Sequence, residues 1–212
     1  MTGWIRNILA TERGWVLVVT LLVMPLVLAF WVYNFQHKVL SISAGHVQSA
    51  LKQAVEAGAG QVTEGSQARG DPRIGTNQAH TAFRAMLAAN LKLNPVTLTP
   101  EKDSPLASAP SYSFIVYNGD GTLAFTGAQP AYRYDFDGVT LSSYPISGMG
   151  FPQTFAISEN DIAYGTGGIY QVELDEPGCV ALINAGLKGF VRTESPVIVR
   201  WASAEVHFTG ER

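Results

Sequence analysis

The sequence contains little charge, a single cysteine and no cluster of basic residues. Charged residues make up 15% of the 212 positions, compared with about 25% in an average soluble domain. Hydrophobic residues reach 47%, which excludes a disordered chain, because such chains combine low hydrophobicity with high net charge. Cys179 has no second cysteine with which to form an intramolecular disulfide or a multi-thiolate metal site. A net charge of −3 without clustered Lys or Arg argues against nucleic-acid binding, because neutralising phosphates requires concentrated positive charge.

Much of the apolarity lies in one run near the N-terminus. Residues 14–37 contain no Lys, Arg, Asp or Glu, and the apolar core of this run is Trp15–Phe35. As a helix this core spans about 31 Å, which matches the thickness of the hydrocarbon core of a bilayer. Trp15 at one end and Trp31 near the other occupy the positions expected for interfacial aromatic residues. We therefore predict a transmembrane helix over residues 15–36.

Two other interpretations of the apolar run remain open. Ser41 and Ser43 would supply the small-residue cleavage site of a secretory signal, but the apolar part of a signal is usually only about 7–15 residues long. A buried helix of a soluble core is the third interpretation, but uncharged stretches of this length are typical of membrane spans. A membrane anchor is the interpretation that the length favours.

The charges on either side of the run predict its orientation. Of the 14 Lys+Arg and 17 Asp+Glu in the chain, only Arg6, Arg13 and Glu12 lie before His37. Short basic segments stay on the cytoplasmic side of a membrane, so residues 1–14 are expected to be cytoplasmic. The remainder of the chain, which is mildly acidic, is expected to lie outside the cytoplasm.

An amphipathic helical stalk is predicted over residues 37–64. Small or apolar side chains recur there at intervals of four and three residues, which places them on one face of a helix. No proline interrupts residues 36–71, so the helix is expected to continue from the membrane to about Val62. Pro25 removes one backbone hydrogen bond and is expected to bend the membrane part. The predicted packing seam consists of Leu40, Ala44, Val47, Leu51, Ala54 and Gly58.

The seam has two interpretations that the spacing does not separate. In the first, the stalk packs on the outer domain of its own chain. In the second, its small residues allow the close approach of identical subunits. These small residues are Ala44, Ala50, Ala54, Ala57 and Gly58.

The fold class predicted for the whole chain is α+β, with the transmembrane helix and its stalk followed by a mainly antiparallel β outer domain. Residues 65–111 are predicted to form a loop, including Gly65–Gly75, and a short helix with Asn77 as its N-cap that contains Ala79–Leu91 and ends near Asn94-Pro95. Residues 112–212 are predicted to form the β-rich extracytoplasmic domain.

Two hairpins are predicted at the start of this domain. Asn118–Gly121 lies between Tyr112–Tyr117 and Thr122–Phe125, and Asn and Gly both tolerate the positive φ angles of a tight turn. The second hairpin joins two segments through Asp137-Gly138. Its segments are Tyr132–Phe136 and Val139–Tyr144, and the further predicted strands are Thr154–Ile157, Ile169–Leu174, Val180–Ile183 and Val197–Phe208.

The sequence contains no pattern that predicts a catalytic centre, a cofactor or a metal, and we do not expect an enzyme. Asp135, Asp137, Asn118 and Asp120 offer hard oxygen ligands, but they do not follow the spaced acidic loop of a calcium site. Asx-Gly pairs are far commoner as turn chemistry. Gly165–Gly168 lacks the Lys-Ser/Thr ending of a phosphate loop. The four histidines show no zinc-ligand spacing either.

A family resemblance is carried by the N-terminal third of the chain. Glu12-Arg13-Gly14 precedes an apolar run with one central proline, Pro25, and the alanine-rich stretch Ala50–Gly60 follows it. Phe83 then lies in the predicted helix that precedes the strands. In these features the chain resembles the TadE/TadG-like family, the pseudopilins of tight-adherence (Flp-type) pilus systems.

The resemblance implies a single-pass protein of the cell membrane with its C-terminal domain outside. It would assist pilus assembly or join surface filaments as a minor subunit, through helix–helix packing with other pilus subunits or with itself. Arg13, Gly14, Trp15 and Pro25 are then the candidate processing and anchoring residues. Prepilin-like members carry Glu at the fifth position after the cleaved Gly, whereas the residue at that position here is Val19. This departure leaves open whether the N-terminus is cleaved.

A membrane-anchored extracytoplasmic binding or sensing module is the alternative hypothesis. In that case the outer sheet binds a wall polymer or another ligand, and the helix only tethers it. The pilus hypothesis depends on the anchor and the seam, whereas the binding hypothesis depends on the outer domain.

Overall fold

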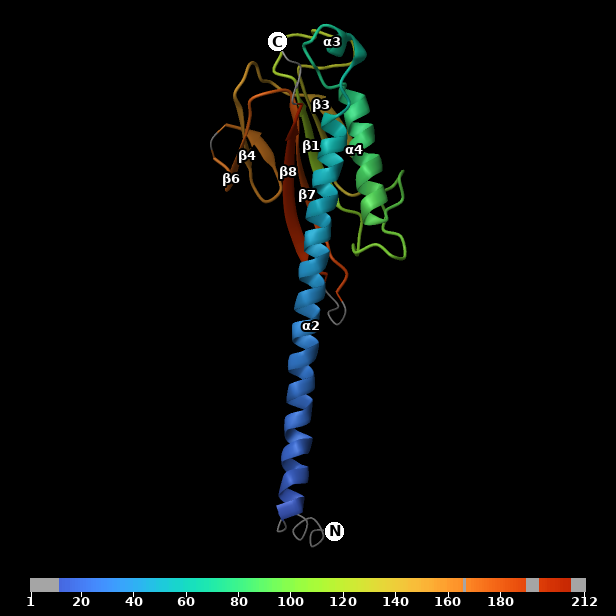
Figure 1. Cartoon of the computed structure of the whole chain (residues 1–212), viewed down its shortest axis with the longest axis vertical. Helices are drawn as coiled ribbons and strands as arrows, with labels where there is room; N and C mark the ends of the chain where they lie inside the picture. The colour runs from blue at the N-terminus through green and yellow to red at the C-terminus, as the bar shows by residue number, and fades with distance from the viewer. Residues whose placement is uncertain (1–11, 166, 190–194, 207–212) are drawn as a thin grey trace. The chain divides into compact units, whose positions relative to one another are not determined.

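The computed structural model describes residues 12–165, 167–189 and 195–206. In this part of the chain three helices precede eight strands (Figure 1). The helices are α2 (Glu12–Ala59), α3 (Glu64–Ala68) and α4 (Thr76–Leu91). The strands are β1 (Ser111–Tyr117), β2 (Ala131–Phe136), β3 (Leu141–Pro145), β4 (Gln153–Ile157), β5 (Ile162–Tyr164), β6 (Tyr170–Leu174), β7 (Gly178–Gly186) and β8 (Val197–Glu205). The predicted α+β class, with a long N-terminal apolar helix followed by a mainly antiparallel β domain, is confirmed.

Helix α2 is continuous over 48 residues, and Pro25 lies inside it. It ends at Ala59, three residues before the expected Val62, because Val62 instead forms a β-bridge with Ile74. The chain divides into two compact units between Ile42 and Ser43. The final third of α2 therefore belongs to the same unit as the sheets.

The larger of two sheets has five strands in the order β3-β2-β1-β7-β8, and every neighbouring pair is antiparallel. Central strand β1 is almost entirely buried. Because successive side chains of a strand point to opposite faces, its residues divide into two sets. Tyr112, Phe114 and Val116 lie on one face, and Ser111, Ser113, Ile115 and Tyr117 lie on the other.

The first face of this sheet is covered by α4 and by the last turns of α2. The ring of Phe114 stacks on that of Phe83 from α4 at a centroid distance of 4.3 Å. A Cβ added at Gly58 of α2 would lie 3.0 Å from Cζ of Phe114. Leu51 and Leu87 are also fully buried. Aromatic residues of the sheet and small or branched residues of the two helices therefore share one core.

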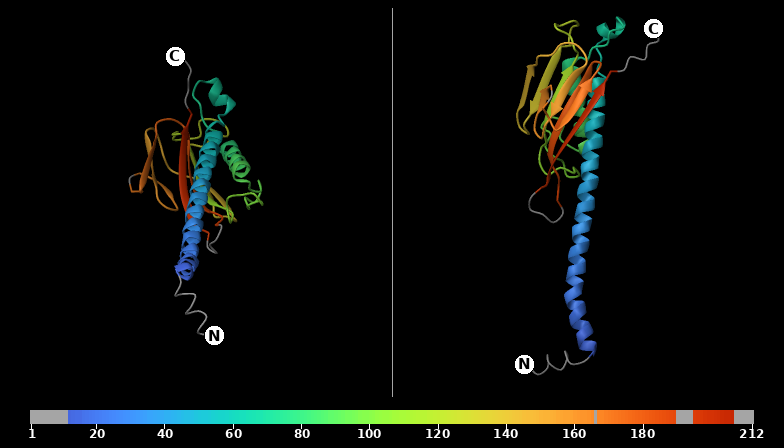
Figure 2. Two further views of the ribbon diagram at one scale, coloured as in Figure 1. Left: turned by 60° about the horizontal axis from the view of Figure 1, so that its bottom comes forward. Right: turned by 90° about the vertical axis from the view of Figure 1, so that its left-hand side faces the viewer.

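The second face is covered by the smaller sheet, which has the order β5-β4-β6. A separate apolar cluster joins the two sheets, so the domain has three layers: helices, a five-stranded sheet and a three-stranded sheet (Figure 2). The buried members of this cluster are Ile115, Tyr117, Ala131, Phe155, Ile157, Ile162, Val172, Leu174, Val180 and Leu182.

Both edges of the five-stranded sheet are modified against further pairing. The hydrogen bond from Ile146 N to Ala131 O fixes the alternation along β3 so that Pro145 faces outward, where its missing N–H removes a donor from the free edge. On β8, the outward carbonyl groups of Val199 and Trp201 accept hydrogen bonds from the side chains of Arg200 and Gln48, at 2.8 and 3.0 Å. The edges are thus partly satisfied within the chain.

The first predicted hairpin is wrong. Strand β1 pairs with β2 and β7, and Thr122–Phe125 is not a strand. The reason is the side chain of Asn118, which is fully buried and bonded to both backbone groups of Ile74 and to the carbonyl of Gln129. Asn118 therefore anchors two loops instead of opening a two-residue turn.

The second predicted hairpin is confirmed as β2–β3, with Gly138 at a φ of 102° in its turn. Asn77 is not the N-cap of α4; the helix begins at Thr76 and Gly75 occupies the cap. The helix also ends at Leu91, before the expected Asn94-Pro95, because Lys92 takes a left-handed conformation with a φ of 55°. Helix α3 lies within the predicted loop and strand β5 was not predicted; both are very short. The predicted end of the last strand, Phe208, lies outside the described residues.

Candidate functional site

The candidate anchor is the first half of α2. Of the helices in the described part of the chain, α2 alone is long and apolar enough to cross a membrane. Trp15 and Trp31 expose 62% and 72% of their surface, and the apolar side chains between them are also exposed. Pro25 lies on this exposed stretch. Arg13 and Gly14 belong to the first turn of α2, and side chains are described from Trp15 onward.

The structure shows what covers most of the predicted seam. Val47, Leu51, Ala54 and Gly58 are buried within their own outer domain, and Leu40 and Ala44 are half-buried. A Cβ at Gly58 would also lie 3.2 Å from the carbonyl oxygen of Ala79. The part of the seam from Val47 onward therefore packs within the outer domain of its own chain, as in the first of the two interpretations.

The acidic groups considered as a metal site do not come together. Asn118 and Asp120 follow the end of β1, whereas Asp135 pairs with Ser113 near its start and Asp137 lies beyond. Asp120 instead accepts hydrogen bonds from the guanidinium of Arg73. No group of three or more His, Cys, Asp or Glu side chains suited to a metal ion occurs within the described residues.

Two further titratable side chains, Cys179 and His80, are buried in the core. Cys179 is fully buried, and burial raises the pKa of its thiol, so it is neither a nucleophile nor an accessible site for an intermolecular disulfide. His80 is 7% exposed, bonds to the hydroxyl of Tyr112 at 2.8 Å and stacks on Tyr134. Desolvation, assisted by the positive charge of Arg84, lowers the pKa of His80 to about 4.

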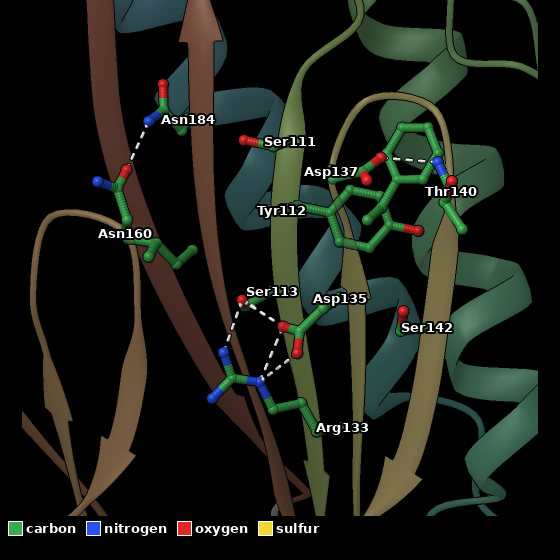
Figure 3. Close-up of a pocket in the computed structure, with 12 residues that line it drawn as sticks. Ser111, Tyr112, Ser113, Arg133, Asp135, Asp137, Thr140, Ser142, Asn160 and Asn184 are labelled. Carbon is green, nitrogen blue, oxygen red and sulfur yellow. Dashed lines mark hydrogen bonds and ion pairs between the residues drawn. The ribbon is translucent and has the colours of Figure 1, made fainter.

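A polar pocket lies on the second face of the five-stranded sheet (Figure 3). Its volume is about 250 Å³, and side chains of β1, β2, β3 and β7 and of the turn between β4 and β5 line it. We call this site the hydroxyl pocket, because three Ser residues and one Thr residue lie in its lining. Its lining residues are Ser111, Tyr112, Ser113, Arg133, Asp135, Phe136, Asp137, Thr140, Ser142, Asn160, Leu182 and Asn184.

An ion pair closes the base of the hydroxyl pocket. Nε of Arg133 donates to both oxygens of Asp135 at 2.8 Å, and Ser113 Oγ and Tyr144 Oη donate to the same carboxylate. Although desolvation acts to raise it, the pKa of Asp135 is held below its usual value because Ser113, Arg133 and Tyr144 donate these bonds. Arg133 also bonds to Asp161 and to the carbonyl of Ile162, which fixes the β4–β5 turn against β2.

Above this ion pair, several polar groups of the hydroxyl pocket have no partner within the described part of the protein. Asn184 Nδ2 donates to Asn160 Oδ1 at 2.7 Å, which leaves the other half of each amide open. The hydroxyl groups of Ser111 and Ser142 have no hydrogen bond to the residues drawn in Figure 3. Asp137 accepts from the backbone N–H groups of Thr140 and Val139 through a single oxygen. These groups are available to a ligand or to solvent.

Sequence reasoning did not find the hydroxyl pocket. Its hydroxyl and amide residues come from segments separated by up to 73 positions, from Ser111 to Asn184, and single Ser or Asn residues carry no local signal. The only indirect signal was polar Ser111 and Ser113 alternating with aromatic residues in a central strand, because polar residues inside a buried strand require a polar neighbour. Comparison of the chain with protein-family models, with curated proteins and with solved structures finds no match.

Proposed function

We propose that this chain is a structural or assembly subunit of a surface pilus system, held in the cell membrane by the first half of α2 with its β domain outside the cytoplasm. The contrast within α2 supports the membrane anchor, and the resemblance of the N-terminal third to the TadE/TadG-like family supports the role in a pilus system. Its apolar side chains up to Phe35 are exposed, whereas Val47, Leu51 and Ala54 are completely buried. An exposed apolar helix of this length needs lipid or neighbouring helices to cover it.

The structure limits where contacts between subunits can form. Ala50, Ala54 and Gly58 are already buried within the outer domain, so these small residues are not free for another subunit. Packing between subunits is therefore assigned to the anchor and to the exposed side of the stalk, where Ile42 is 65% exposed and a Cβ at Gly45 meets nothing within 4 Å.

Disulfide cross-linking in native membranes tests this proposal. Single cysteines at Leu22 and Leu28 report contacts of the anchor, and one at Ile42 reports contacts of the stalk. The natural Cys179 does not interfere, because it is buried. A cysteine at exposed Val96 is the matched control. We expect disulfides between copies of this chain from one face of the anchor, because a disulfide requires a cysteine on each partner. Uniform absence of cross-links in the anchor would contradict packing of the anchor against a second copy.

The native N-terminus distinguishes the two forms of the proposal. Mass spectrometry of sheared filaments and of membranes is the measurement. Trp15 as the first residue in filaments identifies a processed pilin, and intact Met1 in the membrane identifies an assembly factor. Recovery of the chain only as a soluble protein would reject both forms.

The second candidate function is a membrane-anchored binding module, and the hydroxyl pocket favours it. Several neutral donors and acceptors there are unpaired in the described part of the chain. A test with the outer domain alone must begin near Ser43, because Val47, Leu51 and Ala54 belong to its core. In that case ligand binding is expected to survive removal of the anchor.

A further inference from the structure

We infer that the hydroxyl pocket binds a single neutral sugar unit, free or at the end of a glycan. The inference gives a ligand class to the binding-module function and is independent of the assembly role. It depends on the pocket's charge, its open hydrogen-bonding groups, its size and its rigidity.

The charge of the pocket disfavours anionic ligands. Asp135 is neutralised by Arg133, and both of its oxygens are engaged by Arg133, Ser113 and Tyr144. Asp137 contributes one further negative charge at the rim, which repels phosphates and uronic acids. Both carboxylate oxygens of Asp135 are engaged, and no group of three or more His, Cys, Asp or Glu side chains suited to a metal ion occurs within the described residues, which disfavours a hard cation. A neutral ligand remains.

The open groups match a polyhydroxyl compound. The hydroxyl groups of Ser111, Ser142 and Thr140 can each donate and accept, Asn184 offers its Oδ1 as an acceptor, and Asn160 offers its Nδ2 as a donor. Sugar hydroxyl groups also donate and accept, so they can pair with all five.

The size and the rigidity of the pocket favour a single ring. Its volume of about 250 Å³ corresponds to about eight water molecules in the liquid and lies below the range of drug-sized sites. The ion pair of Arg133 with Asp135 and Asp161 holds the sheet and the β4–β5 turn together. The walls are therefore arranged before a ligand enters, which reduces the entropic cost of binding.

Saturation-transfer NMR on the full chain tests the inference, in lipid nanodiscs or in a detergent without a sugar headgroup. The probes are glucose and its charged analogue, glucuronic acid. We expect saturation of the glucose ring protons and at least tenfold weaker binding of glucuronic acid. Absence of saturation at millimolar glucose, or equal binding of the two probes, would overturn the inference.

Variants locate the binding. Asn184→Ala combined with Ser142→Ala removes two hydrogen-bonding side chains from the pocket and is expected to weaken binding about tenfold, or about 1.4 kcal/mol. Ser49→Ala, at an exposed position of α2, is the matched control, and thermal unfolding verifies that all three proteins are folded. Binding that the double variant leaves unchanged would place the sugar elsewhere and reject the hydroxyl pocket. Cross-linking of the anchor reports independently on the assembly role.

Discussion

The two halves of α2 both carry apolar side chains, but those side chains lie in opposite environments. From Trp15 to Phe35 the helix exposes nearly all of its apolar side chains, with Leu21 at 69%, whereas Val47, Leu51 and Ala54 are completely buried. Both halves belong to one unbroken helix. The apolar side chains of the second half are therefore covered by the chain's own sheet. Those of the first half need a membrane or another molecule to cover them.

Truncating a buried side chain in the second half is expected to have the largest effect. Leu51→Ala removes a fully buried side chain beneath the sheet and should lower the free energy of unfolding by about 2–5 kcal/mol. Leu28→Ala in the exposed half is the control and should leave the unfolding of the β domain unchanged. Denaturant unfolding followed by near-ultraviolet circular dichroism measures both. Equal losses of unfolding free energy in the two variants would contradict the different burial of the two halves.

A charge in the first half tests the membrane directly. Leu22→Arg places a guanidinium within the uncharged run and should cost about 3 kcal/mol of insertion free energy. The fraction of chain that resists alkaline extraction from membranes is the measurement, with Leu22→Phe as the control. The outer domain should unfold as in the wild type. If Leu22→Arg is retained as strongly as Leu22→Phe, the first half is not a membrane span.

Mild acid should lower the stability of the outer domain, because His80 is buried in its core, and should leave the exposed first half of α2 unaffected. His80 packs on the helix-covered face of the sheet, and its pKa is lowered to about 4. A group that is neutral in the fold binds more protons when unfolded, so its contribution is complete above about pH 6.5 and is lost as the pH falls toward 4. The loss should reach about 2–3 kcal/mol.

Chemical unfolding as a function of pH measures this effect, with His80→Phe as the variant that should flatten the profile between pH 6.5 and 4. His46→Phe is the exposed control. The lowered pKa of Asp135 acts in a different window, because stability from a depressed carboxylate is lost only as the pH falls through that lower value. An unchanged profile for His80→Phe would contradict the assignment.

Replacing a glycine by leucine should have different effects at a buried and at an open position of α2. Gly58→Leu would bring the new side chain against Phe114 and Ala79, and overpacking of this kind typically costs about 1–3 kcal/mol. Gly45→Leu, thirteen residues earlier on α2, meets open space and should not destabilise the domain. Thermal unfolding compares the two variants. Loss of filament incorporation by Gly45→Leu with normal stability would support contacts on the exposed side of the stalk.

Local patterns were sufficient wherever one property repeated along the chain. The apolar run, the four-three spacing and the β2–β3 turn each follow from neighbouring residues, and each was predicted. The prediction of the first hairpin was wrong because Asn118 hydrogen-bonds to Ile74 and Gln129. The residues near Asn118 in the sequence do not indicate these partners. The hydroxyl pocket was missed for the same reason.

By itself the sequence determined the α+β class, the position of the one long apolar helix and the face of its second half that packs. These depend on composition and on periodicities of two or about 3.6 residues, which are local quantities. Only the tertiary structure decided that Val47–Gly58 packs on the chain's own sheet and that Ser111, Ser142 and Asn184 line one pocket. Those facts depend on which strands pair, and strand pairing is settled by contacts between residues far apart in the chain.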